Sequence, residues 1–250
     1  MHGSTNTLTG GDNPRQVVRA PQTLRGLHAF AAFVLLFFLA AQAFGFITSP
    51  PDRDMGHLQK IMYVHVPAAW SAMVAYFLVF IASIGYLWKR DERYDLFAAS
   101  AVEVGVVLNA LALALGMIWG RPTWGVWWEW EPRLTSTLVM LVIYAGYLAL
   151  RAYTEDDERR ARWSAAVGAL AFLNVPIVYM SVRWWPTLHQ VQSTRATVDG
   201  PYALGLELNG FAFLLLMILF VLLRYEVARV RRATETLREE RALTEGVAHV

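Results

Sequence analysis

Hydrophobic positions in this chain of 250 residues gather into six long blocks, which polar segments separate. Each block is about 17 to 24 residues long, the length that an α-helix needs to cross a hydrocarbon layer of roughly 30 Å. Lipid cannot satisfy backbone hydrogen-bonding groups, so the blocks are expected to be helices. The pattern predicts an all-α integral membrane protein with six transmembrane helices. The predicted spans are Leu27–Ile47, Val66–Trp88, Leu96–Trp119, Leu134–Leu150, Trp163–Val182 and Leu204–Leu223.

The composition agrees with this pattern and excludes some chemistry. Hydrophobic residues make up 56% of the chain and charged residues 17%, whereas a soluble domain carries about 25% charged residues. Cysteine is absent, which excludes disulfides, thiolate metal sites and thiol redox chemistry on this chain.

The two ends of the chain differ from the six-span domain, residues 27–223. Residues 1–26 are polar and contain glycine and proline, so a disordered N-terminus is expected. They do not resemble a cleaved signal peptide, because the apolar run that follows is too long and no A-x-A site follows it. Residues 224–250 are rich in helix formers and mixed charge, which predicts a solvated helix that extends the sixth span.

Charge predicts the orientation of the spans. Sixteen of the 22 lysine and arginine residues fall in the two termini and in the connections after the second and fourth spans. By the positive-inside rule these segments are cytoplasmic, which gives an N-in, C-in topology. The connections 48–65, 120–133 and 183–203 then lie outside. Eight of the ten tryptophans lie at that outer face, more than an anchoring belt requires.

Residues 119–136 read WGRPTWGVWWEWEPRLTS and hold five of these tryptophans. We interpret this external loop between the third and fourth spans as an aromatic platform for a flat, apolar ligand. Gly120 and Gly125 let the backbone turn, and Glu131 with Pro132 forms an N-cap and first turn for the fourth span. The alternative is an amphipathic belt in the lipid headgroups. The platform residues are Trp119, Trp124, Trp127, Trp128 and Trp130.

Two histidines lie at similar depth on the same face. The stretch DMGHLQKIMYVH predicts a short external amphipathic helix before the second span, with His65 at its end and facing inward. His189 follows the fifth span. A lone histidine at a helix end is more often a polar cap, but the pair beside the tryptophans is typical of axial ligands to haem iron.

Haem also carries two propionates, and few outer arginines could bind them. Arg183, beside Trp184 and close to His189, is the first choice. Arg133 is the second, with neutralisation of Glu129 or Glu131 as its alternative role. Polar side chains within the spans, such as Glu103 and Asn109, are interpreted chiefly as interhelical hydrogen-bonding groups rather than a pathway.

The tryptophan motif and the two outer histidines resemble the haem-handling membrane proteins of cytochrome c maturation. The Arg133-Leu134-Thr135 sequence after the motif is similar to the short six-span branch, the cytochrome c biogenesis protein C family. The family motif ends in Trp-Asp, whereas this chain has Trp130-Glu131, which keeps the charge and adds a methylene.

This resemblance implies non-covalent, transient binding of haem b at the periplasmic face of a bacterial inner membrane. The residues it implies are His65 and His189 on the iron, with the tryptophan loop against the porphyrin. It implies a membrane-anchored haem chaperone, a small single-span subunit and ABC transporter subunits as partners, besides the lipid bilayer, and no nucleic acid.

Three functions remain open from the sequence. The first is a haem-presenting adaptor that is not an enzyme, because no catalytic constellation is evident. The second is a haem-translocating transporter subunit, although the chain has no GxxxxGK[ST] nucleotide-binding loop. The third is a b-type electron-transfer cytochrome, which usually has its histidines within the spans.

Overall fold

The computed structural model describes residues 22–193, 196–198 and 200–248. Within these residues the chain is helical and contains no β-strand, and six helical segments are long and apolar enough to cross a membrane. The elements are α1 (Gln22–Thr48), the 3₁₀ helix η1 (His57–Ile61), α2 (Met62–Lys89), α3 (Glu92–Trp124), α4 (Pro132–Tyr153), α5 (Asp157–Ala171), α6 (Asn174–Trp184) and α7 (Gly200–Ala248).

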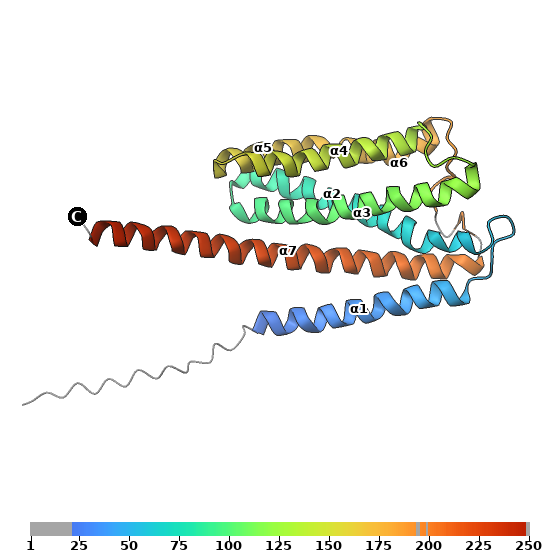
Figure 1. The fold of residues 1–250 in the computed structure, drawn as a ribbon, viewed down its shortest axis with the longest axis horizontal. Coiled ribbons are helices and arrows are strands. Elements are labelled where there is room, and N and C mark those ends of the chain that lie inside the picture. Colours follow the sequence, from blue (N-terminus) through green and yellow to red (C-terminus); the bar gives the residue numbers. More distant parts are fainter. Residues whose placement is uncertain (1–21, 194–195, 199, 249–250) are drawn as a thin grey trace, which may run out of the picture.

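The centre of the bundle is the pair α2 and α3, with α4, α5 and α6 on one side and α1 and α7 on the other (Figure 1). Small buried residues recur along one face of α2, including Ala68, Ala72 and Ala75, and α3 contributes Ala98 and Ala101. Small side chains let two helix backbones approach closely, which is how membrane helices pack without a strong hydrophobic driving force. The close pairing sets the start of α2 beside the end of α3.

The connections that follow α1, α3 and α6 lie together at one end of the bundle (Figure 1). The start of α1 and the C-terminal end of α7 point toward the other end. The three segments that were predicted to share one face of the membrane therefore lie close to one another.

The third span is longer than the sequence predicts. It was expected to end at Trp119, but α3 continues to Trp124, so the connection shrinks to residues 125–131. Side chains stabilise this end: Arg121 donates to the carbonyl of Gly125 and Thr123 to that of Trp119. Gly125, with φ of 80°, ends the helix in the left-handed region that glycine tolerates, whereas Gly120, predicted to allow a turn, is buried within the helix.

The fifth span is broken where a single helix was predicted. α5 ends at Ala171 and α6 begins at Asn174. Pro176 has no N–H to donate to the carbonyl of Phe172, and its ring crowds that carbonyl. The N–H of Val175 donates to the Phe172 carbonyl instead, at 3.0 Å, which tightens the chain at the break.

Three predictions at helix starts also need correction. The external helix before the second span is only the short η1, in which Leu58 is exposed and Gln59 is buried, so the predicted apolar stripe is wrong there. His65 lies in the first turns of α2 and not at the end of a separate helix, because α2 begins at Met62. At the N-terminus, helix α1 begins at Gln22, so residues 22–26 are helical; the rest of the predicted disordered segment lies outside the described residues.

The polar side chains within the spans make interhelical bonds, as predicted. Asn174 donates to the carbonyl of Ser136 at 2.9 Å, and Asn209 donates to that of Ala41 at 3.0 Å. Glu103 forms an ion pair with Arg224 on α7, with 2.5 Å between Oε2 and Nε. These contacts join α4 to α6, α1 to α7 and α3 to α7.

Candidate cofactor-binding site

His65 is held on a helix by a hydrogen bond to the neighbouring helix. Its Nδ1 lies 2.8 Å from the carbonyl oxygen of Ala112 on α3. A carbonyl only accepts, so Nδ1 carries the proton and Nε2 keeps its lone pair in the neutral ring. Gly116 makes this approach possible, because a Cβ there would lie 3.1 Å from Cε1 of His65.

His189 lies outside any helix, in the segment between α6 and α7. Its backbone N–H donates to Oγ1 of Thr187 at 3.1 Å. Its Nδ1 lies 3.2 Å from Oε1 of Glu131, which is ion-pair distance, although the angles fall outside those of a hydrogen bond. The side chains of His189 and Glu131 are largely buried, with 17% and 6% of their surface exposed. As in His65, the ring has Nδ1 beside an acceptor.

Glu131 caps α4, as predicted. Its Oε1 accepts from the N–H of Leu134 at 2.6 Å, Pro132 occupies the first helical position, and Oε2 accepts from the hydroxyl of Thr187. Burial alone would raise the pKa of this carboxyl group. The interactions with His189, Thr187 and the Leu134 N–H outweigh burial and lower its pKa to about 2.

Each histidine has a tryptophan of α3 against it. Trp119 meets His65 edge-on, with ring centroids 5.9 Å apart, and Trp124 meets His189 in the same way at 4.8 Å. The sequence predicted Trp119 at the end of the third span and Trp124 in the loop that follows, both as faces for a flat ligand. Both lie on the last turns of α3, with their rings edge-on to the imidazoles.

The two histidines share the wall between two adjoining chambers. The inner chamber extends into the bundle toward Asn109 and Met140, and the outer chamber reaches Trp119 and Trp124. Their cavity volumes are about 100 Å³ for the inner chamber and about 240 Å³ for the outer one. The residues that line both chambers are His65, Val66, Gly116, Arg133, His189 and Ser193.

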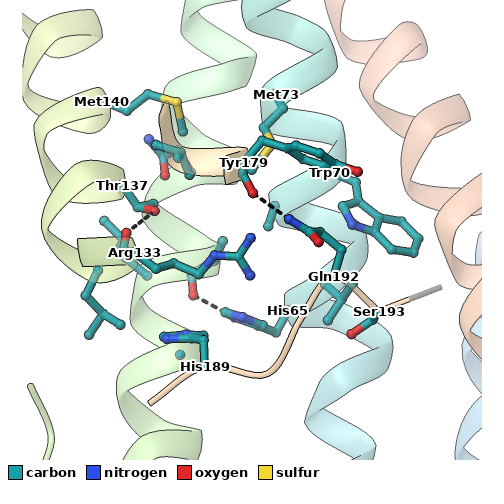
Figure 2. A pocket seen from close by; sticks show the side chains of 18 residues that line it. His65, Trp70, Met73, Arg133, Thr137, Met140, Tyr179, His189, Gln192 and Ser193 are labelled. Carbon is teal, nitrogen blue, oxygen red and sulfur yellow. Dashed lines mark hydrogen bonds between the residues drawn. The ribbon is translucent and has the colours of Figure 1, made fainter. Parts of the chain in front are cut away.

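Arg133 projects from α4 into this shared space (Figure 2). No hydrogen bond or ion pair joins its guanidinium group to another residue in the part of the chain that the structure describes. A partly buried guanidinium group that makes no hydrogen bond, and interacts with Glu131 only through space, favours an anionic ligand, because a buried charge is costly unless it is paired and hydrogen-bonded. This geometry reverses the predicted order of the arginines: Arg183 is exposed, donates to Gln192 at 3.2 Å and lines neither chamber.

The remaining predicted site residues lie away from the chambers. Trp127 and Trp130 are 56% and 72% exposed, Trp128 meets Trp130 edge-on, and Trp184 is exposed beside Trp185. Of the predicted platform, Trp119 and Trp124 line the outer chamber, Trp127 and Trp130 are exposed, and Trp128 is partly buried.

Sequence reasoning missed other residues of the site. Thr187 binds Glu131, which is far away along the chain, and Trp70, Met73 and Gln192 line the inner chamber. The only sequence signal for Thr187 is its position two residues before His189. Nothing in the sequence marks the three residues of the inner chamber.

The side chains around the two chambers suit a metal that is already coordinated within a cofactor, rather than a bare metal ion. The described residues contain no cluster of three or more histidine, cysteine, aspartate or glutamate side chains that could hold a bare metal ion. Two imidazoles, a free guanidinium and an apolar wall fit haem, whose iron receives four nitrogens from the porphyrin and whose propionates are anionic.

Comparison with known proteins gives the family. Residues 9–240 match the family model described as "Heme exporter protein C". The chain is 38% identical to the heme exporter protein C of Bradyrhizobium diazoefficiens, covering 80% of this chain and 78% of the relative. It is 37% identical to that of Escherichia coli K12, covering 78% and 80%. A putative cytochrome c biosynthesis ccmC-like mitochondrial protein of Marchantia polymorpha is 35% identical, covering 63% and 67%. The chain therefore belongs to the heme exporter protein C family.

Proposed function

We propose that this protein binds haem in the cavity between α2, α3, α4 and the α6–α7 segment, and presents it to a haem chaperone during the maturation of c-type cytochromes. One observation carries the proposal: two imidazoles with Nδ1 beside an acceptor adjoin one cavity that also contains an unpaired guanidinium group. The matching family and the name of the Marchantia relative support haem handling for cytochrome c maturation.

In this proposal His65 and His189 are the axial ligands through Nε2. Haem iron commonly takes histidine nitrogen in axial positions. Arg133 binds a propionate, because a guanidinium fork matches a carboxylate in two parallel hydrogen bonds. Trp119 and Trp124 hold the two imidazole rings edge-on. The cargo is non-covalent haem b, which must leave again, so the protein acts as a binding and transfer protein and not as an enzyme.

The membrane placement follows from charge. The segments rich in lysine and arginine predict that the N-terminus and the end of α7 are cytoplasmic. The cavity then faces the periplasm of a bacterial inner membrane. The exposed Trp127 and Trp130 are a surface for the membrane-anchored chaperone, since aromatic residues are enriched in protein interfaces. A small single-span subunit and ABC transporter subunits would complete the assembly.

Presentation at one face is favoured over conduction through the bundle. The hydroxyl of Tyr76 accepts from Nδ2 of Asn109, a residue of the inner chamber, at 3.4 Å. The ring of Tyr76 stacks on that of Tyr144, with centroids 3.6 Å apart at an angle of 4°, and both tyrosines are fully buried. Neither tyrosine lines either chamber, which supports a cavity that opens at one face rather than a passage through the bundle.

Absorption spectra of the purified protein test the proposal. The wild-type protein loaded with haem is expected to show a low-spin, bis-imidazole spectrum, and His65→Ala and His189→Ala are each expected to lose it. A wild-type protein that stays colourless after exposure to haem would refute the proposal. Reconstituted vesicles test the alternative, because net movement of haem across the bilayer by this chain alone would favour a transporter.

A further inference from the structure

The carboxylate of Glu131 joins the start of α4 to the segment after α6. One oxygen caps the first turn of α4 through the N–H of Leu134, at 2.6 Å. The other accepts from the hydroxyl of Thr187, which lies in the segment after α6. The same hydroxyl accepts from the backbone N–H of His189 at 3.1 Å, so it acts as donor and acceptor at once.

The two histidines are supported in different ways. His65 is on α2, and a helical backbone together with the Ala112 carbonyl fixes its position. His189 has no helix beneath it and depends on contacts made by side chains. The carboxylate of Glu131 lies beside Nδ1, the hydroxyl of Thr187 accepts from the backbone N–H, and Trp124 packs edge-on against the ring.

We propose that Glu131 and Thr187 are positioning residues for His189. Together they hold its ring so that Nε2 faces the cavity, and they do this from α4 rather than from the segment that carries the histidine. The inference rests on the proposed function in so far as His189 binds haem iron. Partners that orient a metal-binding histidine change metal affinity by about 10- to 100-fold when they are removed.

Capping of α4 alone does not explain the arrangement. An N-cap requires one acceptor for an N–H of the first turn, and Oε1 already provides it. The bond between Oε2 and Thr187 adds nothing to the cap. A substitution at Thr187 therefore separates the two roles, whereas a substitution at Glu131 removes both.

The test compares Thr187→Val, which has nearly the same shape and no hydroxyl, with Thr187→Ser, which keeps the hydroxyl. The full-length proteins are purified in detergent and loaded with haem, and transfer of haem to an excess of apomyoglobin is timed. Thr187→Val is expected to lose haem about tenfold faster than the wild type and to gain a high-spin fraction. Thr187→Ser is expected to retain most of the wild-type rate and spectrum.

A second measurement does not depend on haem. In the apo protein labelled with ¹⁵N-histidine, the His189 signal, assigned by its loss in His189→Ala, is expected to report a single tautomer protonated on Nδ1. Thr187→Val is expected to give a mixture of tautomers. Wild-type signals and wild-type haem release in Thr187→Val would overturn the positioning role. A wild-type protein without a bis-imidazole spectrum, but with the tautomer change, would overturn the proposed function and leave the positioning role standing.

Discussion

Gly116 on α3 leaves room for the ring of His65 on α2, because the Cβ that glycine lacks would lie 3.1 Å from Cε1 of the imidazole. This close approach lets Nδ1 reach the carbonyl of Ala112, and it fixes which ring nitrogen faces the cavity. The position of His65 on α2 thus depends on the residue at 116 of α3 being glycine, which has no side chain.

Gly116→Ala is expected to displace the His65 ring and lower haem retention several-fold. The apo protein should lose no more than about 1–2 kcal/mol of stability, because the helix propensity that alanine gains, about 1 kcal/mol, offsets part of the lost bond between His65 and the Ala112 carbonyl. Haem titration and thermal unfolding measure the two effects separately. Gly146→Ala on α4 is the control, since a Cβ there meets no atom within 4 Å. Equal haem retention in the two variants would contradict this account of Gly116.

Arg133→Gln is expected to weaken haem binding about tenfold or more, because a charged hydrogen bond of about 1.5–3 kcal/mol is lost. Arg183→Gln is the matched control, since Arg183 donates to Gln192 and lines neither chamber. Binding of haem dimethyl ester, whose propionates are uncharged, should differ little between the wild type and Arg133→Gln. A similar loss of affinity for the ester would show that Arg133 acts on something other than a propionate.

The depressed pKa of Glu131 predicts how stability changes with acid. Its folded pKa of about 2 lies below the ordinary value of 4.5, so the carboxylate stabilises the fold fully above about pH 4.5. That contribution is lost as the pH falls from about 4.5 toward 2. The melting temperature of the apo wild type should exceed that of Glu131→Gln at neutral pH, and the difference should shrink through this range. Repeating the comparison in the His189→Ala background measures how much of this stabilisation depends on His189, whose Nδ1 lies 3.2 Å from Oε1 of Glu131.

Gly168→Ala is expected to destabilise the bundle. A Cβ at this position on α5 would lie 2.5 Å from the hydroxyl of Ser83 on α2 and 3.1 Å from Val79. Overpacking of this kind typically costs about 1–3 kcal/mol. Thermal unfolding in detergent should show the loss, and the double variant Gly168→Ala, Ser83→Ala should recover part of it. No recovery would mean that the contact with Val79 governs the packing at this point.

We expect the tryptophans to separate into two functional groups. Trp124→Leu is expected to reduce haem retention, because it removes the contact with His189. Trp127→Leu with Trp130→Leu should leave the haem spectrum unchanged and weaken binding of the chaperone, because both indoles are exposed. Spectra and co-purification with the chaperone measure the two effects. Altered spectra in the double variant would place these indoles at the haem instead.

The sequence predicts the number of spans, because apolar run length is a local property, and it predicts that the three connections holding the site lie at one end of the bundle. It also predicts the N-cap at Glu131, which depends on residues adjacent in the chain. It misses the break before Pro176 because the flanking residues continue the apolar run on both sides. It sets the end of α3 five residues too early because side-chain hydrogen bonds from Arg121 and Thr123 extend the helix.

The details of the site require three-dimensional information. The pattern of residues pairs His65 with His189, but it ranks Arg183 above Arg133, because proximity along the chain was the only guide. The structure places Arg133 on the wall shared by both chambers. Likewise, the link between Glu131 and Thr187 depends on how the segment after α6 folds back over the start of α4, which no local pattern reveals.

The stacked rings of Tyr76 and Tyr144 also bear on the energetics of the cell. If the protein binds haem as proposed, the membrane around it must still hold a proton gradient while a dianionic ligand is bound. Tyr76 on α2 and Tyr144 on α4 are fully buried and stack with centroids 3.6 Å apart, so the contact between these two helices excludes water at this level.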